Sequence, residues 1–506
     1  MTKIHTYLKL TDFNEVVFYN QEVELSDEIV SKVEQSFNFL KFFSENKIIY
    51  GVNTGFGPMA QYRVKDQDRT QLQYNLIRSH ASGIGNPLNP LFVKSSILAR
   101  LHTLSLGCSG VHPSVIQLMK ELINRDITPL IFEHGGVGAS GDLVQLAHLA
   151  LVLIGEGEVF YKDERRPTKE VFEQENLKPI QVEIREGLAL MNGTSVMTGI
   201  GIVNAFRSRQ LIDWMLKASC SINEIVNAYD DHFSEGLNAV KKHDGQQQIA
   251  FKMREYLFDS KRIKKREEHL YNGISNEEIF KEKVQEYYSL RCVPQILGPV
   301  LDTLNNAEQV LENEINSAND NPIVDVKNKQ VYHGGNFHGD YVALEMDKLK
   351  IVITKLTMLA ERQLNYLMNS KLNEILPPFV NLGVLGFNFG MQGVQFTATS
   401  TTAENQTLSN PMYIHSIPNN NDNQDVVSMG TNAATMTSKV IENAFEVVAI
   451  ELIAIVQAID VLGGIDGFSS TTKEMYYELR QIVPTFKNDK ALYPYLQKVK
   501  AHLMKH

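Results

Sequence analysis

The amino-acid sequence predicts a mainly α-helical protein, a bundle of long helices with a smaller, loop-rich N-terminal domain. Three segments, residues 299–315, 341–371 and 432–462, repeat apolar residues at helical spacing and contain no Gly or Pro after their first residue. Glycine-rich loops and short strand-like runs are concentrated in the first part of the chain. We therefore expect an N-terminal domain over residues 1–200 and a long-helix bundle domain over residues 201–506.

Composition and charge are those of a globular protein: of the 506 residues, 43% are hydrophobic and 21% are charged. The net charge of −10 argues against a nucleic-acid partner. The most apolar segment, residues 447–462, is interrupted by Glu451, Gln457 and Asp460, which predicts a core helix and no membrane contact. Three scattered cysteines form no CxxC pair, and the first residues contain no apolar signal-peptide core. We therefore expect a cytoplasmic protein.

The first sixty residues contain a predicted helix and then a glycine-rich loop. Ser26 is a candidate N-cap for a helix with Ile29 and Val33 on its apolar face. Residues 48–50 have the apolar character of a short strand and lead into the loop. In one interpretation the loop is a turn and Tyr50 serves packing. In the other it is a mobile lid on which Tyr50 transfers a proton.

The next segments alternate helices with short strands. Residues 70–125 have a helical pattern, and His80 lies near a predicted helix end, where a single His is more often structural than functional. Residues 159–161 and 179–182 are predicted strands. Asn192 and the glycine after it form a turn signal.

One stretch, residues 135–142, has the sequence GGVGASGD and precedes a predicted helix that starts near Asp142. It fits the G-x-G-x-x-G pattern of a dinucleotide-binding loop, but the chain lacks the βαβ repetition which that pattern requires. It also fits a plain turn in which Ser140 or Asp142 caps the helix.

A third interpretation of this stretch is chemical. In a tight bend the amide nitrogen of Gly141 can attack the carbonyl carbon of Ala139. Loss of two water molecules then leaves a methylidene-imidazolone, whose exposed carbon comes from Ser140. The start of the following helix would stabilise negative charge that develops on this ring.

Residues 137–143, VGASGDL, resemble the prosthetic-group motif of the histidine, phenylalanine and tyrosine ammonia-lyases and the related aminomutases. Val144 and Gln145 follow where many members have Ala-Pro. The resemblance implies a 4-methylidene-imidazol-5-one (MIO) group formed from Ala139, Ser140 and Gly141, and it implies that the N-terminal domain carries this group. It extends over nearly the whole chain.

The loop after Tyr50, GVNTGFG, is similar to the lid loop of the same family, in which the Tyr is the catalytic base. The segment QEYYSLR, residues 285–291, resembles a motif whose Arg binds the substrate carboxylate, although Glu286 replaces Asp and Tyr287 replaces Pro. The resemblance implies these substrate-binding residues: Gly57, His80, Asn192, Tyr288, Arg291, Phe337, Glu404, Asn420, Asn423 and Gln424.

The substrate is the least determined part of the resemblance. The pair Ser79-His80 is the histidine-lyase pattern at the ring position, whereas residues 423–426, NQDV, are the phenylalanine- and tyrosine-lyase pattern. We expect a tyrosine ammonia-lyase that converts L-tyrosine to trans-p-coumarate and ammonia. Histidine ammonia-lyase is the main alternative, followed by phenylalanine ammonia-lyase and tyrosine 2,3-aminomutase.

Other classes fit the sequence less well. A nicotinamide-dependent dehydrogenase would depend on the glycine-rich stretch alone, and a helical scaffold gives no reason for Tyr50, Ser140 and Arg291 to occur together. His333 and His338 lie five residues apart, but neither an HExxH motif nor a cysteine cluster accompanies them, so we expect no metal. In the family the active sites form between subunits of a homotetramer, which we expect here too.

Overall fold

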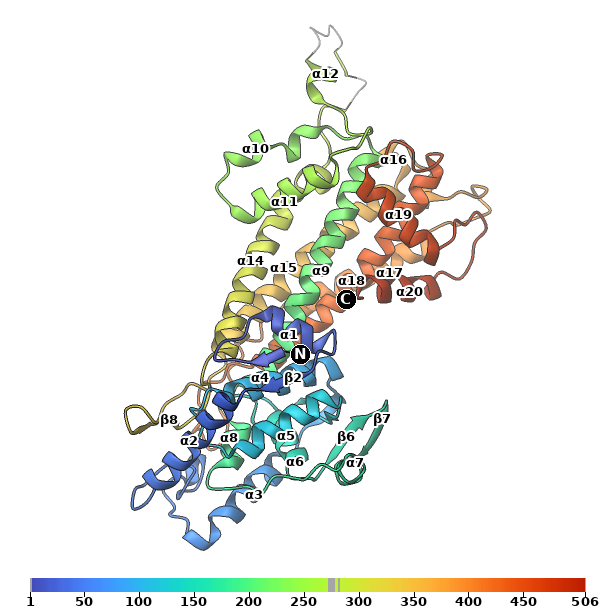
Figure 1. Ribbon diagram of the computed structural model, residues 1–506. Helices are drawn as coiled ribbons and strands as arrows, with labels where there is room; N and C mark the ends of the chain where they lie inside the picture. Colours follow the sequence, from blue (N-terminus) through green and yellow to red (C-terminus); the bar gives the residue numbers. More distant parts are fainter. Residues whose placement is uncertain (1, 272–277, 281–282, 506) are drawn as a thin grey trace.

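The computed structural model describes residues 2–271, 278–280 and 283–505. Figure 1 shows an elongated bundle of long helices above a lobe of shorter helices, loops and small sheets. The lobe is formed mainly by the first part of the chain and the bundle by the second part. The predicted fold class, mainly α-helical with a long-helix bundle, is confirmed.

Five long helices form the bundle: α9 (Ser195–Ile225), α14 (Val293–Ile315), α15 (Asp340–Met368), α17 (Gln392–Leu408) and α18 (Gly430–Val461). Helix α18 packs against α9, α15 and α17, and α15 also packs against α14. Side chains on nearly every face of α18 are buried, because helices surround it. At 1.5 Å per residue, α15 and α18 are each roughly 45 Å long.

The predicted helices at residues 341–371 and 432–462 are confirmed within a few residues. The third begins earlier than predicted, at Val293: Pro294 lies in the first turn, where its missing N–H has no helical partner, and Pro299 lies inside the helix. We did not predict α9 from the sequence, because Gly199 and Gly201 weaken its helical pattern. A Cβ at Gly199 would lie 2.5 Å from the backbone nitrogen of Ser96, so that glycine allows α9 to pack closely against α4.

The lobe contains the shorter helices of the first part of the chain. Their bounds are α1 (Leu10–Val17), α2 (Asp27–Phe43), α3 (Arg69–His80), α4 (Pro90–Ser105), α5 (Pro113–Asn124), α6 (Leu143–Leu153), α7 (Thr168–Glu175) and α8 (Glu186–Met191). The predicted cap of α2 is confirmed, because the Ser26 side chain accepts a hydrogen bond from the backbone N–H of Ile29. The predicted start of α6 near Asp142 is also confirmed.

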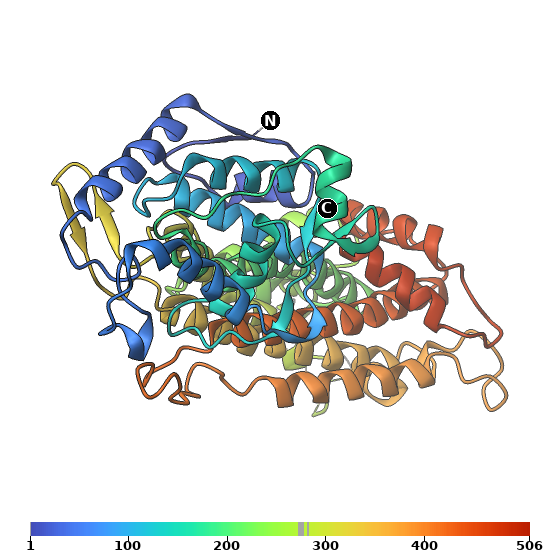
Figure 2. The same cartoon turned by 90° about the horizontal axis from the view of Figure 1, so that it is seen from below.

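In the part of the chain that the structure describes, the strands are short and form four small sheets. They pair as β1 (Thr2–Ile4) with β2 (Val23–Leu25), β3 (Ile84–Pro87) with β5 (Phe132–His134), β4 (Thr128–Pro129) with β6 (Glu158–Tyr161), β6 with β7 (Glu164–Pro167), and β8 (Ile323–Asp325) with β9 (Gln330–Tyr332). The β8–β9 hairpin lies beside α2 at one edge of the lobe, as Figure 2 shows.

One of the three predicted strands is confirmed, at residues 159–161, which lie within β6. The other two are wrong. At residues 48–50 the chain turns, because the carbonyl of Ile49 accepts from the backbone N–H groups of Val52 and Asn53. Residues 179–182 have no pairing strand, since Ile180 donates to the carbonyl of Leu153 at the end of α6.

The remaining helices cover the bundle at its far end and side. They are α10 (Glu235–Ala239), α11 (Asp244–Tyr256), α12 (Arg266–Leu270), α13 (Tyr288–Arg291), α16 (Ser370–Asn373), α19 (Ser470–Ile482) and α20 (Tyr493–Leu503). The 3-10 turns at Gly57–Met59 and Asp66–Asp68 precede α3 in the lobe, and those at Asp230–Phe233 and Pro378–Val380 belong to the bundle part of the chain. None of the helices in the described residues is long and apolar enough to cross a membrane.

Candidate active site

Four helices begin at the loop of residues 135–142, which we call the glycine loop. Helix α6 follows it directly, and α9 begins beside it. The backbone N–H of Gly339, just before α15, donates to the carbonyl of Gly138 at 3.0 Å, and the N–H of Met429, just before α18, donates to the carbonyl of Val137 at 3.0 Å. Because helix N-termini carry partial positive charge, they favour negative charge at this loop.

Hydrogen bonds to two other segments, residues 192–193 and Gln424, hold the Ala-Ser-Gly tripeptide and the residue that follows it. Asn192, which is 3% exposed, donates from its side-chain amide to the carbonyl of Ser140 at 3.0 Å. Gln424 donates to the Ser140 hydroxyl at 3.0 Å. The backbone N–H of Asp142 donates to the carbonyl of Gly193 at 2.8 Å. The serine is therefore bound at both its carbonyl and its hydroxyl.

The bend of the tripeptide requires glycine. Gly141 has a φ of +71°, and a Cβ there would lie 2.1 Å from the carbonyl oxygen of Gly193. Ala139 is 4% exposed, so a larger side chain would need space that the surrounding core does not provide. A small residue, a serine and a glycine in a clamped left-handed bend are what backbone ring closure needs. The residues present therefore fit the MIO group.

Asp142 links the glycine loop to two helices. Its carboxylate accepts from the backbone N–H groups of Val196 and Met197 in the first turn of α9, at 2.8 and 2.9 Å, and from the hydroxyl of Thr431 in α18. The side chain is fully buried, and desolvation raises its pKa to about 6 despite these hydrogen bonds. This side chain holds the helices together at the loop.

Tyr50 begins the loop of residues 50–57, which we call the lid loop. Its hydroxyl oxygen accepts a hydrogen bond from the backbone N–H of Gly57 at 3.0 Å. The backbone N–H of Tyr50 donates to Nε2 of His333 at 3.3 Å. A Cβ at Gly57 would lie 2.8 Å from the side-chain amide of Asn420, so the lid loop touches the segment of residues 419–424.

Residues 419–424 form a tight turn closed by backbone bonds between Asn419 and Gln424, which we call the asparagine turn. One side of it contacts Gly57 in the lid loop, and the other holds the Ser140 hydroxyl through Gln424. Asn423 is exposed on the same turn. Within one chain, the loop of Tyr50, the predicted base, and Ser140, which is predicted to form the electrophile, therefore contact the same short segment.

Two more predicted residues lie near the glycine loop. Phe337 is half-buried, two residues before Gly339, which bonds to the loop. His80 ends α3, and its Nδ1 lies 3.0 Å from both the Ser79 hydroxyl and the Leu76 carbonyl. The strand β3, which follows soon after His80, pairs with β5, which leads into the glycine loop.

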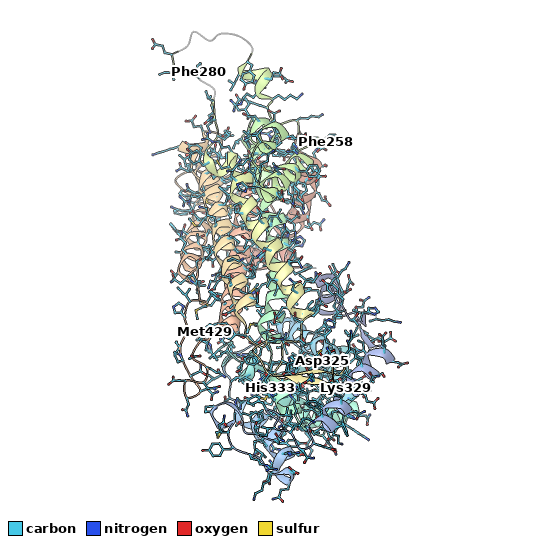
Figure 3. The ribbon with its side chains drawn as sticks, turned by 90° about the vertical axis from the view of Figure 1, so that its left-hand side faces the viewer. Phe258, Phe280, Asp325, Lys329, His333 and Met429 are labelled. Carbon is cyan, nitrogen blue, oxygen red and sulfur yellow. The ribbon has the colours of Figure 1, made fainter. Side chains whose placement is uncertain are left out.

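Three predicted residues lie far from the loop. The side chain of Gln363 in α15 donates to the carbonyl of Ser289 at 2.7 Å, so Tyr288 and Arg291 lie roughly 35 Å along that helix from its start. Glu404 accepts from Asn443 at 2.6 Å, roughly 20 Å along α18. Figure 3 shows the same separation, with Met429 near the lobe and Phe280 at the opposite end of the bundle.

The segment of residues 285–291, which we call the arginine segment, is held mainly by its own neighbours. Arg291 donates to the Gln285 side chain and to the Glu286 carbonyl, and its guanidinium lies 4.6 Å from the ring centre of Tyr288. The Tyr288 side chain is 69% exposed. Most of the segment also lines an open cavity of about 640 Å³ with Arg362 and residues of α15.

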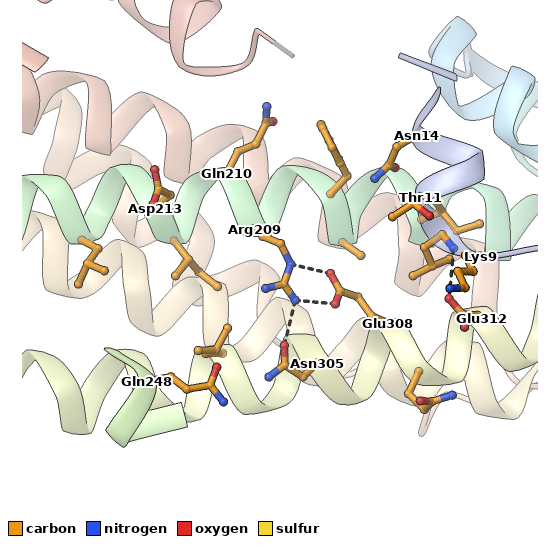
Figure 4. A pocket seen from close by; sticks show the side chains of 18 of the residues that line it. Lys9, Thr11, Asn14, Arg209, Gln210, Asp213, Gln248, Asn305, Glu308 and Glu312 are labelled. Carbon is orange, nitrogen blue, oxygen red and sulfur yellow. Dashed lines mark hydrogen bonds and ion pairs between the residues drawn. The ribbon is translucent and has the colours of Figure 1, made fainter. Parts of the chain in front are cut away.

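A groove of about 740 Å³ lies between α9 and α14, with α1 and α11 at its ends. Arg209 crosses it and binds Glu308, with Nε 2.9 Å from Oε1, and Asn305 at 2.9 Å, as Figure 4 shows. Among the described residues that line the groove, none is a predicted site residue. The groove is separate from the candidate active site.

Sequence reasoning missed two residues that support the site. Arg100 is fully buried beside the turn that holds Ser140. A charged residue within the mostly apolar helical run of residues 96–104 was the sequence signal that could have indicated this role. His333, for which we discounted a metal-ligand role and named no other, accepts a hydrogen bond from the backbone of Tyr50. No local pattern connects residue 333 with residue 50.

The helical bundle and the clamped Ala-Ser-Gly bend define a class of enzymes, the carbon–nitrogen lyases that act on aromatic amino acids. The family model for aromatic amino acid lyase matches residues 8–481, and the chain belongs to this family.

Similar proteins include both lyases and aminomutases. A tyrosine 2,3-aminomutase of Chondromyces crocatus is 39% identical over 501 residues, which cover 98% of this chain and 94% of that protein. A histidine ammonia-lyase of Bacillus cytotoxicus is 36% identical over 499 residues, covering 98% and 95%. The crystal structure of a tyrosine aminomutase from Streptomyces globisporus has a TM-score of 0.93 at 34% identity, covering 99% of this chain and 96% of that one.

Proposed function

We propose that this chain is a tyrosine ammonia-lyase, which converts L-tyrosine to trans-p-coumarate and ammonia. The observation that carries the proposal is the asparagine turn, since it touches the loop of Tyr50 and also holds the Ser140 hydroxyl. A base and an electrophile on the two sides of one short segment suit removal of a proton and of an amine from adjacent carbons.

Ala139, Ser140 and Gly141 would form the MIO group in place. The group supplies an electrophile that turns the substrate amine into a better leaving group. Asn192 and Gln424 hold the serine at its two oxygens. The helix N-termini around the glycine loop favour the negative charge that the electrophile takes up.

Tyr50 is the proposed base, which removes a proton from the substrate β-carbon. The N–H of Gly57 points at its hydroxyl oxygen at 3.0 Å. This contact fixes the position of the hydroxyl oxygen within the loop. The bond from the Tyr50 N–H to His333 fixes the backbone of the same residue.

Arg291 is the proposed partner of the substrate carboxylate, because its guanidinium can bind two oxygens at once. A single tyrosine cannot reach Arg291 and Ser140 of one chain across roughly 35 Å of helix. We therefore propose that the active enzyme is a homotetramer, in which Arg291, Tyr288 and Glu404 of other copies complete the site at each glycine loop.

Two observations favour tyrosine over histidine as the substrate. Residues 423–426, NQDV, follow the phenylalanine- and tyrosine-lyase pattern, and Gln424 is the residue that binds Ser140. Tyrosine is also named for the relative from Chondromyces crocatus. His80 fits either substrate, since a neutral imidazole can hydrogen-bond a phenol.

A second candidate function is tyrosine 2,3-aminomutase. The observation that favours it is the 39% identity to an enzyme of that name over 98% of this chain. The two activities share the electrophile and the base, and they differ in whether ammonia adds back to the β-carbon before the product leaves.

The test is parallel incubation of the purified enzyme with L-tyrosine, L-phenylalanine and L-histidine, with products separated by chromatography. We expect p-coumarate as the main product, with little cinnamate or urocanate. If β-tyrosine is the main product, the enzyme is an aminomutase and not a lyase. If urocanate is the main product, the substrate is histidine and not tyrosine. The S140A variant serves as the background control.

A further inference from the structure

Arg100 in α4 binds the turn that contacts the glycine loop. Its guanidinium donates through Nη2 to the carbonyls of Ala189 and Asn192, the latter at 2.9 Å, and through Nη1 to the side-chain oxygen of Asn319 at 3.2 Å. The side chain is fully buried, and desolvation lowers its pKa to about 10, so it stays charged at neutral pH. The three oxygens it binds in this network belong to neutral groups.

The turn held by Arg100 lies against the Ala-Ser-Gly tripeptide. Asn192 binds the carbonyl of Ser140, and Gly193 accepts from Asp142, so the turn is bonded on both sides of Gly141. Gly141 and Gly193 also pair as an isolated parallel bridge.

Two glycines leave no free space between the guanidinium and the tripeptide. A Cβ at Gly193 would lie 2.2 Å from Nη1 of Arg100, and a Cβ at Gly141 would lie 2.1 Å from the Gly193 carbonyl oxygen. The guanidinium, the turn and the bend are therefore stacked in contact. A movement of the turn toward Arg100 would release the bend at Gly141.

We propose that Arg100 is a positioning residue for formation of the prosthetic group. It holds residues 192–193 against the bend, so that the nitrogen of Gly141 stays directed at the carbonyl carbon of Ala139. This role rests on the proposed function, because it requires that the tripeptide cyclises.

The reaction that Arg100 assists is a double dehydration and needs no oxidant. A bond forms between the Gly141 nitrogen and the Ala139 carbonyl carbon. The former carbonyl oxygen leaves as water with the Gly141 and Ser140 amide hydrogens, which makes a C=N bond to the Ser140 nitrogen. The Ser140 hydroxyl then leaves with its α-hydrogen as the second water, which makes the C=C bond.

A guanidinium suits this task because it is planar and carries several fixed donors. Without it the carbonyls of Ala189 and Asn192 would be buried acceptors without their charged donor, and the turn would relax toward other partners. A lysine offers one compact charge at the end of a flexible chain, so we expect it to hold one carbonyl and to restore the geometry only in part.

The test is the intact mass of the full-length protein, a readout that does not depend on turnover. We expect the mass of the wild-type protein to be lower than its sequence mass by two water molecules. We expect most or all of the R100M protein to keep the mass of these two water molecules. The matched control is R207M, which removes another buried arginine, one that lies 3.8 Å from Glu442 and roughly 18 Å along α9 from its start. R207M should be dehydrated like the wild type.

Circular dichroism and thermal melting show whether each variant is folded. If R100M does not fold, R100K is compared with the wild type directly after purification and again after incubation. We expect R100K to be a mixture of the two masses that shifts slowly toward the dehydrated form. Complete dehydration of folded R100M, or of fresh R100K, would overturn the role of Arg100.

These outcomes separate this proposal from the proposed function. A wild-type protein at its full sequence mass removes the electrophile, and the role of Arg100 with it. If the wild-type protein is dehydrated but does not convert tyrosine, only the substrate assignment is contradicted. Dehydration of both R100M and the wild type contradicts the role of Arg100 alone.

Discussion

The glycine loop and the arginine segment carry the two ends of the proposed active site, and the chain holds them in different ways. Bonds to the glycine loop come from residues distant in sequence, including Asn192, Gly339, Gln424 and Met429. Arg291 is instead bonded within its own segment. Asp142 is fully buried in the first region, whereas Tyr288 is 69% exposed in the second.

This difference separates two tasks. Ring closure needs a backbone held in one shape, and only a surrounding core of the same chain provides that. Binding a substrate carboxylate needs an accessible cation, and Arg291 lines a cavity of about 310 Å³ together with Gln285 and Glu286. Under the proposed function, the first task is completed within one copy, while the second requires contact with another copy. The following predictions test this division in order of decreasing effect.

The largest effect is expected for S140A. Without the serine hydroxyl no methylidene carbon can form, so activity should fall to background while the fold is retained. Activity is measured by p-coumarate release and folding by circular dichroism. S26A is the control, since it removes the α2 cap at a cost of about 1 kcal/mol and leaves the loop intact. Turnover by S140A would contradict the mechanism.

The next effect is expected for Y50F. Loss of the base should lower kcat by roughly 10²- to 10⁴-fold, with dehydration of the glycine loop unchanged in the intact mass. The matched control is Y62F, because Tyr62 is 70% exposed and its backbone carbonyl accepts from Gly55 in the same lid loop. Equal losses in both variants would point to lid folding and remove Tyr50 from the base role.

A mixing experiment tests whether the two regions act between copies. Y50F and R291A should each be nearly inactive alone. After unfolding and refolding as a mixture, roughly one site in four should draw both intact residues, because they come from different copies of a symmetric oligomer. Activity of the mixture is compared with that of each variant refolded alone. If the mixture recovers nothing, Tyr50 and Arg291 act within one chain.

The smallest effect is a pH dependence of stability. Burial raises the pKa of Asp142 from 3.8 to about 6. The folded protein then binds more protons than the unfolded chain between these values, so this group's contribution to stability falls as pH rises through that window. The full change is about 3 kcal/mol, at 1.36 kcal/mol per unit.

D142N removes this titration. The free energy of unfolding of the variant minus that of the wild type should decrease as the pH is lowered from 7 to 4, as measured by urea unfolding at each pH. D340N is the control, since Asp340 starts α15 near the same loop and is half-buried. A constant difference between D142N and the wild type would show that Asp142 does not titrate in this range.

The sequence predicted what depends on local pattern. Apolar spacing predicted α15 and α18 within a few residues, and Ser26 predicted the start of α2. The strand at residues 48–50 was wrong, because apolar character alone does not distinguish a strand from a turn in which only Ile49 is buried. Helix α9 was missed, because Gly199 and Gly201 weaken its helical pattern, and Gly199 serves close packing against α4.

The site was predicted as a set of residues and not as an arrangement. The motifs identified Ser140, Tyr50 and Arg291 as site residues. Sequence spacing does not show that the loops of Ser140 and Tyr50 meet at the asparagine turn, or that Arg291 lies near the far end of α15. Arg100 and His333 were missed as supports because their partners are distant in sequence. Such contacts are decided by packing.

The hydrogen bonds around the glycine loop also have a consequence for the order of events in the cell. Gln424 and Met429 come from the last fifth of the chain, and both bind the loop. A ribosome that has translated only residues 1–400 has therefore exposed the tripeptide without these contacts. Under the proposed function, ring closure that depends on these contacts follows the synthesis of Gln424 and Met429, so the reactive alkene would not meet cellular thiols while the protein is still being made.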